Sequence, residues 1–392
     1  MTVAADRDAA FLAGIGEVAQ TIAAVHADDV DRHARFPVEA VTALREQQAL
    51  SAMIPEELGG GGVSFRTIAQ GCFELGRRCG ATAMVFAMHQ IKVATVLRHL
   101  DGAPWFEGFL REVAAEQLLL ASVTSEQGTG GDMSRSIAAV TPTDAPGVFS
   151  FEKQAPTVSY GAYADALITT LRRTPEAEAN DQVVVLTRAS ETTLEPKGTW
   201  DPLGMRGTCS PGYVVSAARL PAEQILAAPF SDVMTQTMVP VSHILWSHIW
   251  LGIATDAFDR ARAFVRAAAR QKPGEPVPAA LKLSNVMREL SLLRAEVHGA
   301  LDEFEACDAE DREKLSTMAM ALRFNNLKLA ASEQAPRVCQ GAMGVCGIVG
   351  FKNDTPFSIG RHLRDSMSAA LMVANDRLIQ TNAGLLLIAK EV

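Results

Sequence analysis

The hydrophobic pattern of this chain changes period twice, and this limits the folds that it can adopt. Up to about residue 116, apolar residues such as Phe11 and Ile15 recur at helical spacing. Between residues 117 and 228 the apolar runs are short and separated by turn residues, which is typical of strands. Helical spacing then returns. The order predicts an α+β chain in which a middle β domain (117–228) separates an N-terminal helical domain (1–116) from a C-terminal helical bundle domain (229–392).

The predicted elements follow from this pattern. Strands are predicted at residues 118–123, 148–151, 166–171, 183–186 and 212–215. The C-terminal block is predicted to form a four-helix bundle from residues 242–269, 279–305, 311–339 and 363–389. The glycine-rich run 341–347 is predicted to be a turn before the last helix. Ser64 is predicted to cap a helix that begins just after it.

Composition argues against several classes of protein. The 392 residues carry a net charge of -9 without a basic cluster, so nucleic acid is not an expected partner. No run of about 18 apolar residues stands out, so no membrane span is expected. The first residues are acidic rather than apolar, which predicts no signal peptide and a cytoplasmic protein. The six cysteines form no CxxC pair, which predicts reduced thiols and no metal site.

Several motifs occur in a fixed order along the chain. They are IPEELGG at 54–60, TSEQGTGGD at 124–132, LGMRGT at 203–208, the glycine run 341–347 and Arg364-Asp365. Together they resemble the motifs of the acyl-CoA dehydrogenase superfamily, and the resemblance covers nearly the whole chain. It implies an acyl-CoA dehydrogenase-like fold, FAD as the cofactor, and a small-molecule substrate, expected to be a thioester.

The resemblance also implies roles for individual residues. Thr124 and Ser125 would meet the polar edge of the flavin, and Ser159 would stand at the position that bonds its N5 atom. The residues assigned to the cofactor are Ser122, Thr124, Ser125, Thr157, Ser159, Arg270, Gln340, Gly341, Gly344 and Asn375. In the superfamily, contacts such as those of Arg270 and Gln340 cross a subunit boundary, so a homodimer or homotetramer is expected.

Three positions depart from the superfamily pattern. Val373 stands where most dehydrogenases have the catalytic glutamate, and Thr157 replaces a tryptophan that covers the flavin. Gly131 replaces a serine near the substrate, so Gly131 and Val373 are expected to face the substrate. A histidine is a competent base near pH 7. His89 and His248 are therefore the candidate bases, with Ser159 as a third candidate catalytic residue.

Three functions remain open at this point. The first is an FAD-dependent oxidoreductase that acts on an acyl-CoA or another acyl thioester by non-standard chemistry. The second is a flavin-dependent monooxygenase of the same fold that uses a C4a-(hydro)peroxide. The third is a non-catalytic relative that only binds a ligand, which the hydroxyl-rich loop at 122–125 disfavours.

Overall fold

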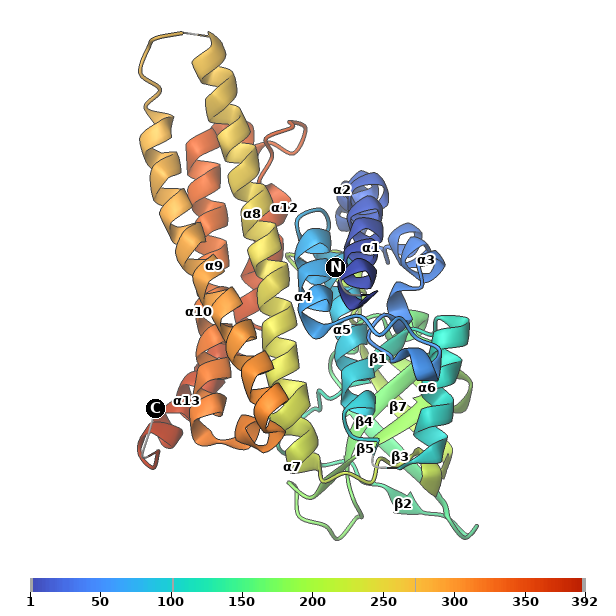
Figure 1. Ribbon diagram of the computed structural model, residues 1–392. Coiled ribbons are helices and arrows are strands. Elements are labelled where there is room, and N and C mark those ends of the chain that lie inside the picture. The colour runs from blue at the N-terminus through green and yellow to red at the C-terminus, as the bar shows by residue number, and fades with distance from the viewer. Residues whose placement is uncertain (1–2, 101, 272, 390–392) are drawn as a thin grey trace.

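The computed structural model describes residues 3–100, 102–271 and 273–389. Its N-terminal part is helical, with α1 (Val3–Val18), α2 (Ala24–His33), α3 (Val38–Glu46), α4 (Phe65–Gly76), α5 (Gly80–Leu97) and α6 (Pro104–Glu116). The Ser64 hydroxyl accepts a bond from the Thr67 amide at 3.3 Å, which confirms the predicted helix cap. Helix α5 is buried on nearly its whole circumference, as a central helix must be (Figure 1).

The middle part forms two sheets. One has the order β1-β4-β5, with β1 parallel to β4 and β4 antiparallel to β5; the other is antiparallel with the order β2-β3-β7-β6. The bounds are β1 Leu120–Val123, β2 Thr141–Pro142, β3 Val148–Ala155, β4 Ala166–Arg172, β5 Gln182–Arg188, β6 Thr193–Lys197 and β7 Gly212–Pro221. The five predicted strands are confirmed. The short, exposed edge strands β2 and β6 were missed because each contains a proline and neither has an alternating apolar pattern.

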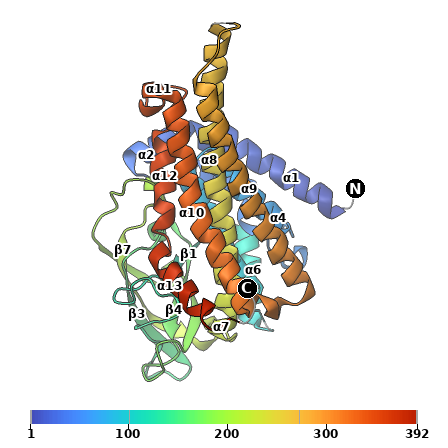
Figure 2. The ribbon, with the colours of Figure 1, turned by 90° about the vertical axis from the view of Figure 1, so that its left-hand side faces the viewer.

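The C-terminal part is helical again. It contains α7 (Phe230–Val233), α8 (Val239–Gln271), α9 (Ala279–Glu310), α10 (Met318–Cys346), α11 (Ile348–Phe351), α12 (Gly360–Met367) and α13 (Asn375–Leu386). Helices α8, α9 and α10 run side by side, and the tips of α8 and α9 project beyond the other elements (Figures 1 and 2). The order of helices, sheets and helices confirms the predicted α+β fold class; the domain boundaries stay predictions.

Two predictions about the C-terminal chain are wrong. The glycine run is not a turn, because α10 continues to Cys346. Gly341 lies where α9 packs closely, since a Cβ there would meet Val286 Cγ2 at 2.9 Å. The last helix is not continuous either. It breaks between Met367 and Asn375, where Val373 adopts a positive φ of 47° that an α-helix does not tolerate.

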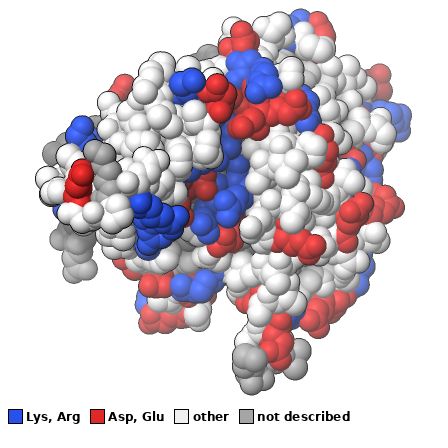
Figure 3. All heavy atoms as spheres, turned by 90° about the horizontal axis from the view of Figure 1, so that it is seen from above, with Lys and Arg blue, Asp and Glu red and all other residues white. Residues whose placement is uncertain are grey.

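Two helical segments are long and apolar enough to cross a membrane by length and composition alone, residues 4–33 and 80–97. Length and composition alone do not test the expectation from sequence that no helix spans a membrane, because the core helix of a globular protein meets the same criterion. The second segment is α5, which is 89% buried inside the protein and so has the surroundings of a core helix. On the face seen in Figure 3, Lys and Arg side chains are interleaved with Asp and Glu.

Candidate active-site cavity

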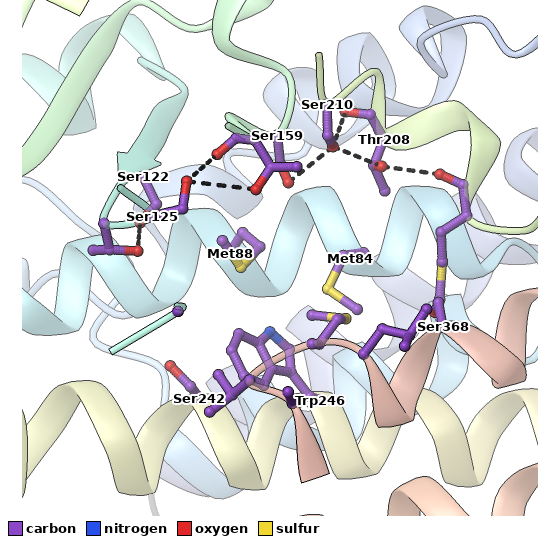
Figure 4. Close-up of a pocket in the computed structure, with 18 of the residues that line it drawn as sticks. Met84, Met88, Ser122, Ser125, Ser159, Thr208, Ser210, Ser242, Trp246 and Ser368 are labelled. Carbon is purple, nitrogen blue, oxygen red and sulfur yellow. Dashed lines mark hydrogen bonds between the residues drawn. The ribbon is translucent and has the colours of Figure 1, made fainter. Parts of the chain in front are cut away.

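A cavity of about 720 Å³ opens where the three parts of the chain meet. Its walls come from α5, the loops that follow β1 and β3, the beginning of α8, and residues 367–374 (Figure 4). A volume of this size is typical of sites that enclose a cofactor or a small ligand.

One wall of the cavity carries a row of hydroxyl groups. Ser210 Oγ donates to Ser159 Oγ at 3.0 Å and lies 2.9 Å from Thr208 Oγ1, while Ser125 Oγ donates to the Thr157 carbonyl at 2.6 Å (Figure 4). The complete row is Ser122, Thr124, Ser125, Thr157, Ser159, Thr208 and Ser210. Ser122 lies in β1 and Thr208 in a short 3-10 helix, and the others lie in loops at the ends of strands, where side chains are free to face a ligand.

The facing wall is apolar. Met84 and Met88 project from α5 toward Trp246 on α8 (Figure 4). Met372 and Val373 also line the cavity. Methionine side chains adapt their shape to a ring and make favourable contacts with aromatic faces. Apolar walls beside a row of hydroxyls fit a flat ring with apolar faces and a polar edge. The flavin implied by the sequence motifs is a ring of this kind.

Among the residues that the structure describes, three charged side chains line the cavity: Lys92, Glu126 and Arg364. Both carboxylate oxygens of Glu126 are committed, since they accept from the Ser136 hydroxyl and two backbone amides and lie 3.5 Å from Lys153 Nζ. Arg364 is paired with Asp31. This lining therefore contains no free carboxylate that could act as a base.

The two candidate histidines do not line the cavity. His89 is fully buried, with Nε2 2.6 Å from the Leu50 carbonyl and Nδ1 accepting from the Leu120 amide at 3.1 Å. Both ring nitrogens are thus engaged with backbone, and burial lowers the pKa of His89 to about 4. His89 therefore ties α5 to the first strand, and the predicted catalytic role is corrected to a structural one.

His248 is corrected for a similar reason. Its Nδ1 lies 2.8 Å from the Ile244 carbonyl of its own helix, and its ring stacks on His298 with centroids 6.0 Å apart. Burial lowers the pKa of His248 to about 4. The ring packs inside the helical bundle rather than facing a substrate. Ser159, the third candidate catalytic residue, does line the cavity.

The predicted cofactor and substrate residues divide into two groups. The cavity is lined by Ser122, Thr124, Ser125, Gly131, Thr157, Ser159 and Val373. The others lie outside it: Arg270, Gln340 and Gly344 are exposed, Gly341 faces α9, and Asn375 binds Lys328. The structure thus brings together the residues predicted for the ring of the cofactor. It does not bring those predicted for the far end of the cofactor into the same cavity of a single chain.

Two motifs that are distant in sequence meet beside the cavity. The Asp365 carboxylate accepts from the Met205 amide at 2.7 Å, and Arg364 donates to the Leu203 carbonyl at 2.9 Å. A Cβ at Gly204 would lie 2.1 Å from the Arg364 carbonyl oxygen, so glycine is required there. Burial raises the pKa of Asp365 to about 6. The Arg364-Asp365 pair anchors the C-terminal wall of the cavity to the β part.

A buried lysine holds the turn at Val373. Lys328 Nζ donates to the Val373 carbonyl at 2.8 Å and to Asn375 Oδ1 at 2.6 Å. A positive φ is a strained backbone state for a β-branched residue, and such strain persists only where surrounding contacts impose it. Lys328 supplies these contacts and thereby fixes the wall formed by Met372 and Val373.

Sequence reasoning missed several residues of the cavity. Thr208 belongs to the motif LGMRGT but received no role, and Ser210 follows it. Lys92 is the only charged residue in α5, and this isolated charge in an apolar helix was the signal that could have revealed it. Ser242 and Trp246 had no local signal, because only the packing of α8 on α5 turns them toward the cavity.

Comparisons with known proteins agree with this architecture. Residues 6–102 match the family model "Acyl-CoA dehydrogenase, N-terminal domain". The probable acyl-CoA dehydrogenase YngJ of Bacillus subtilis (strain 168) is 24% identical over 350 residues, which cover 88% of each chain.

Solved structures share the fold over nearly the whole chain. FMN-bound TdsC of Paenibacillus sp. A11-2, a dibenzothiophene monooxygenase, has a TM-score of 0.80 at 19% identity, with 96% of this chain and 97% of that chain covered. Butyryl-CoA dehydrogenase of Megasphaera elsdenii has a TM-score of 0.81 at 18% identity, with 99% of each chain covered. The family match places residues 6–102 in the acyl-CoA dehydrogenase N-terminal domain family, and the chain as a whole shares the fold of the acyl-CoA dehydrogenases.

Proposed function

We propose that this protein is a flavin-dependent monooxygenase that acts on a small molecule bound beside the flavin in the cavity. The observation that carries this proposal is the lining itself, which keeps the hydroxyl row but has no free carboxylate among its described residues. Removal of an α-proton from a thioester needs a base within hydrogen-bond reach. Transfer of an oxygen atom to a substrate does not require a base at the position of Val373.

The residues of the cavity would contact different parts of the flavin. Ser159 would donate a hydrogen bond to the polar edge of the ring while its own oxygen accepts from Ser210, and Met84 and Trp246 would pack against the faces of the ring. The flavin, once reduced, would supply two electrons to dioxygen, so that one oxygen atom reaches the substrate and the other leaves as water. The apolar wall keeps bulk water away from the reacting face and so limits unproductive side reactions.

A second candidate is oxidation of an acyl thioester by non-standard chemistry. It is favoured by the relative YngJ, described as a probable acyl-CoA dehydrogenase, which matches 88% of this chain. Val373 supplies no base for that reaction, so the base would have to come from the substrate or from another residue of the cavity.

We also propose that the functional unit is at least a dimer. Arg270, Gln340 and Gly344, which the motifs assign to the far end of the cofactor, lie on exposed surface in a single chain. A second subunit would bring such positions to a shared site. This proposal expects the protein to bind FAD more tightly than FMN, because FMN lacks the adenosine end that these residues would bind.

Titration of the purified protein with FMN and FAD, followed by rapid mixing of the reduced protein with oxygenated buffer, tests these proposals. The monooxygenase proposal expects a transient spectrum that matches neither oxidised nor reduced flavin. Direct return to the oxidised spectrum, together with anaerobic bleaching by acyl-CoAs, would favour thioester oxidation. Failure to bind either flavin would contradict both proposals and leave only a ligand-binding role.

Ser159→Ala provides a matched test of the hydroxyl row. Loss of one hydrogen bond to the ring should weaken flavin binding by roughly 2- to 10-fold. Ser190→Ala is the control, since Ser190 is exposed and lies outside the cavity. Equal flavin affinity in the two variants would show that Ser159 does not contact the ring.

A further inference from the structure

Lys92 is the unusual residue of the cavity. Its side chain is 2% exposed, and among the described residues no hydrogen bond or ion pair engages its ammonium group. The two other charged residues of the lining are held by partners, Glu126 by four groups and Arg364 by Asp31. A buried charge without a partner is costly, and proteins rarely keep one that is not used.

The position of Lys92 within the cavity follows from helix geometry. Met84, Met88 and Lys92 are spaced by four residues, so they lie along one face of α5. Figure 4 shows that the step from Met84 to Met88 leads toward the end of the cavity where Ser242 stands. Lys92, one turn further along, therefore belongs to that end, together with Met238, which precedes Ser242 by one turn of helix.

Ser242 adds a second donor at this end. It is 7% exposed, its hydroxyl points into the cavity, and it has no hydrogen-bond partner among the described residues. The hydroxyls on the opposite wall are instead linked to one another or to backbone. Two unused donors, one of them cationic, thus share an end of a mainly apolar cavity. A plain hydrocarbon chain would bind poorly at this end because it would leave both donors without a partner, whereas a negatively charged acceptor would form charge-assisted hydrogen bonds.

We infer that the substrate carries a carboxylate or another anionic group, and that Lys92, assisted by Ser242, binds this group as the specificity-determining residue. The inference rests on the proposed function, because it assumes that substrate and flavin share this cavity. Burial lowers the pKa of Lys92 to about 8, so the side chain remains mainly protonated at pH 7. It is therefore better suited to hold an anion than to act as a base.

The test uses pairs of probes that share a shape and differ in charge: butyrate and butyramide, benzoate and benzamide, 3-phenylpropionate and its amide. Their affinities for the flavin-loaded protein are measured by titration calorimetry at pH 7. The inference expects at least one carboxylate to bind about 10-fold or more tightly than its amide, as a charge-assisted bond in an apolar site would give. If no carboxylate binds more tightly than its amide, the inference is wrong.

Two variants locate the effect. Lys92→Met, which keeps an unbranched side chain one atom shorter than lysine, should abolish the preference for carboxylates, whereas Lys92→Arg should retain part of it. Lys92→Met should also raise the melting temperature, because a buried unpaired charge is removed. A carboxylate preference that persists in Lys92→Met would overturn the assignment. If that variant does not fold, Lys92→Arg decides instead: a reduced preference for carboxylates would show that Lys92 sets it, and an unchanged preference would count against this role.

Flavin affinity, measured separately without probes, keeps the two proposals apart. Failure of both the wild type and the variants to bind flavin would contradict the proposed function. Normal flavin binding without any preference for carboxylates would contradict only the role of Lys92.

Discussion

Substitution of Gly252 by alanine offers a sharp test of how α8 is positioned. A Cβ at this position would lie 2.4 Å from the Phe73 carbonyl oxygen and 3.0 Å from the Arg77 amide nitrogen, at the C-terminal end of α4. On the other helix, a Cβ at Gly76 would lie 2.7 Å from the Ile249 carbonyl oxygen. The clashing atoms are backbone, so no side-chain rotation can relieve the contact.

The size of the effect follows from these distances. Ordinary contact begins near 3.4 Å, so α4 and α8 must separate by about 1 Å to admit the methyl group. Overpacking of this kind costs about 3 kcal/mol, at the upper end of the usual range, because both helices are held by further contacts. Alanine in a helix interior recovers about 1 kcal/mol relative to glycine. The net expectation for Gly252→Ala is a destabilisation of about 2 kcal/mol.

Gly108→Ala is the matched control. Gly108 lies inside α6 and is exposed, and a methyl group added there would meet no atom within 4 Å, so this variant should gain about 1 kcal/mol. Thermal unfolding and hydrogen exchange of α4 and α8 would be compared for both variants. A Gly252→Ala protein as stable as Gly108→Ala would refute the close crossing of these helices. Since α8 carries Ser242 and Trp246, Gly252→Ala should also weaken flavin binding.

Two further predictions concern buried polar groups. Lys328→Met removes two hydrogen bonds to the turn at Val373, so the free energy of local opening at residues 371–378 should fall by roughly 2 kcal/mol, and amide hydrogen exchange there should accelerate accordingly. The exposed control Lys352→Met should leave the exchange rate unchanged. Acid should destabilise the protein between pH 6.5 and 4, because burial lowers the pKa of four histidines to about 4. They are His89, His243, His248 and His362. In this interval the unfolded chain binds more protons than the native chain, so the free energy of unfolding decreases as the pH is lowered, by up to about 3 kcal/mol per histidine.

The acid prediction has one opposing contribution and a direct check. The raised pKa of Asp365 makes the native state bind a proton below about pH 6, which favours folding at low pH, but one carboxyl opposes four imidazoles. Denaturant unfolding at pH 7 and pH 5, with His89→Gln as the variant, measures the balance. Equal stability at the two pH values would contradict the burial of neutral histidines. A smaller pH dependence in His89→Gln than in the wild type is expected.

Periodicity and motifs were sufficient for the fold class. The strands at 166–171 and 183–186 were recognisable because buried strands are continuous apolar runs, and Ser64 was recognisable because a cap acts through local bonds. The row from Ser122 to Ser159 was found for a related reason. Thr124 and Ser125 lie in the motif TSEQGTGGD, the resemblance assigned Ser122, Thr157 and Ser159, and the structure places these residues on one wall.

The sequence by itself therefore determined the order of the helical and β parts, the resemblance to the acyl-CoA dehydrogenases and most of the hydroxyl wall, apart from Thr208 and Ser210. Only the tertiary structure decided which charges are free. Glu126 and Lys92 look alike in sequence as isolated charges, but Glu126 is saturated by residues 136–138 and Lys153, whereas Lys92 has no such partner among the described residues. His89 and His248 looked catalytic until their partners were known. Burial and pairing depend on groups distant in sequence, so no local pattern encodes them.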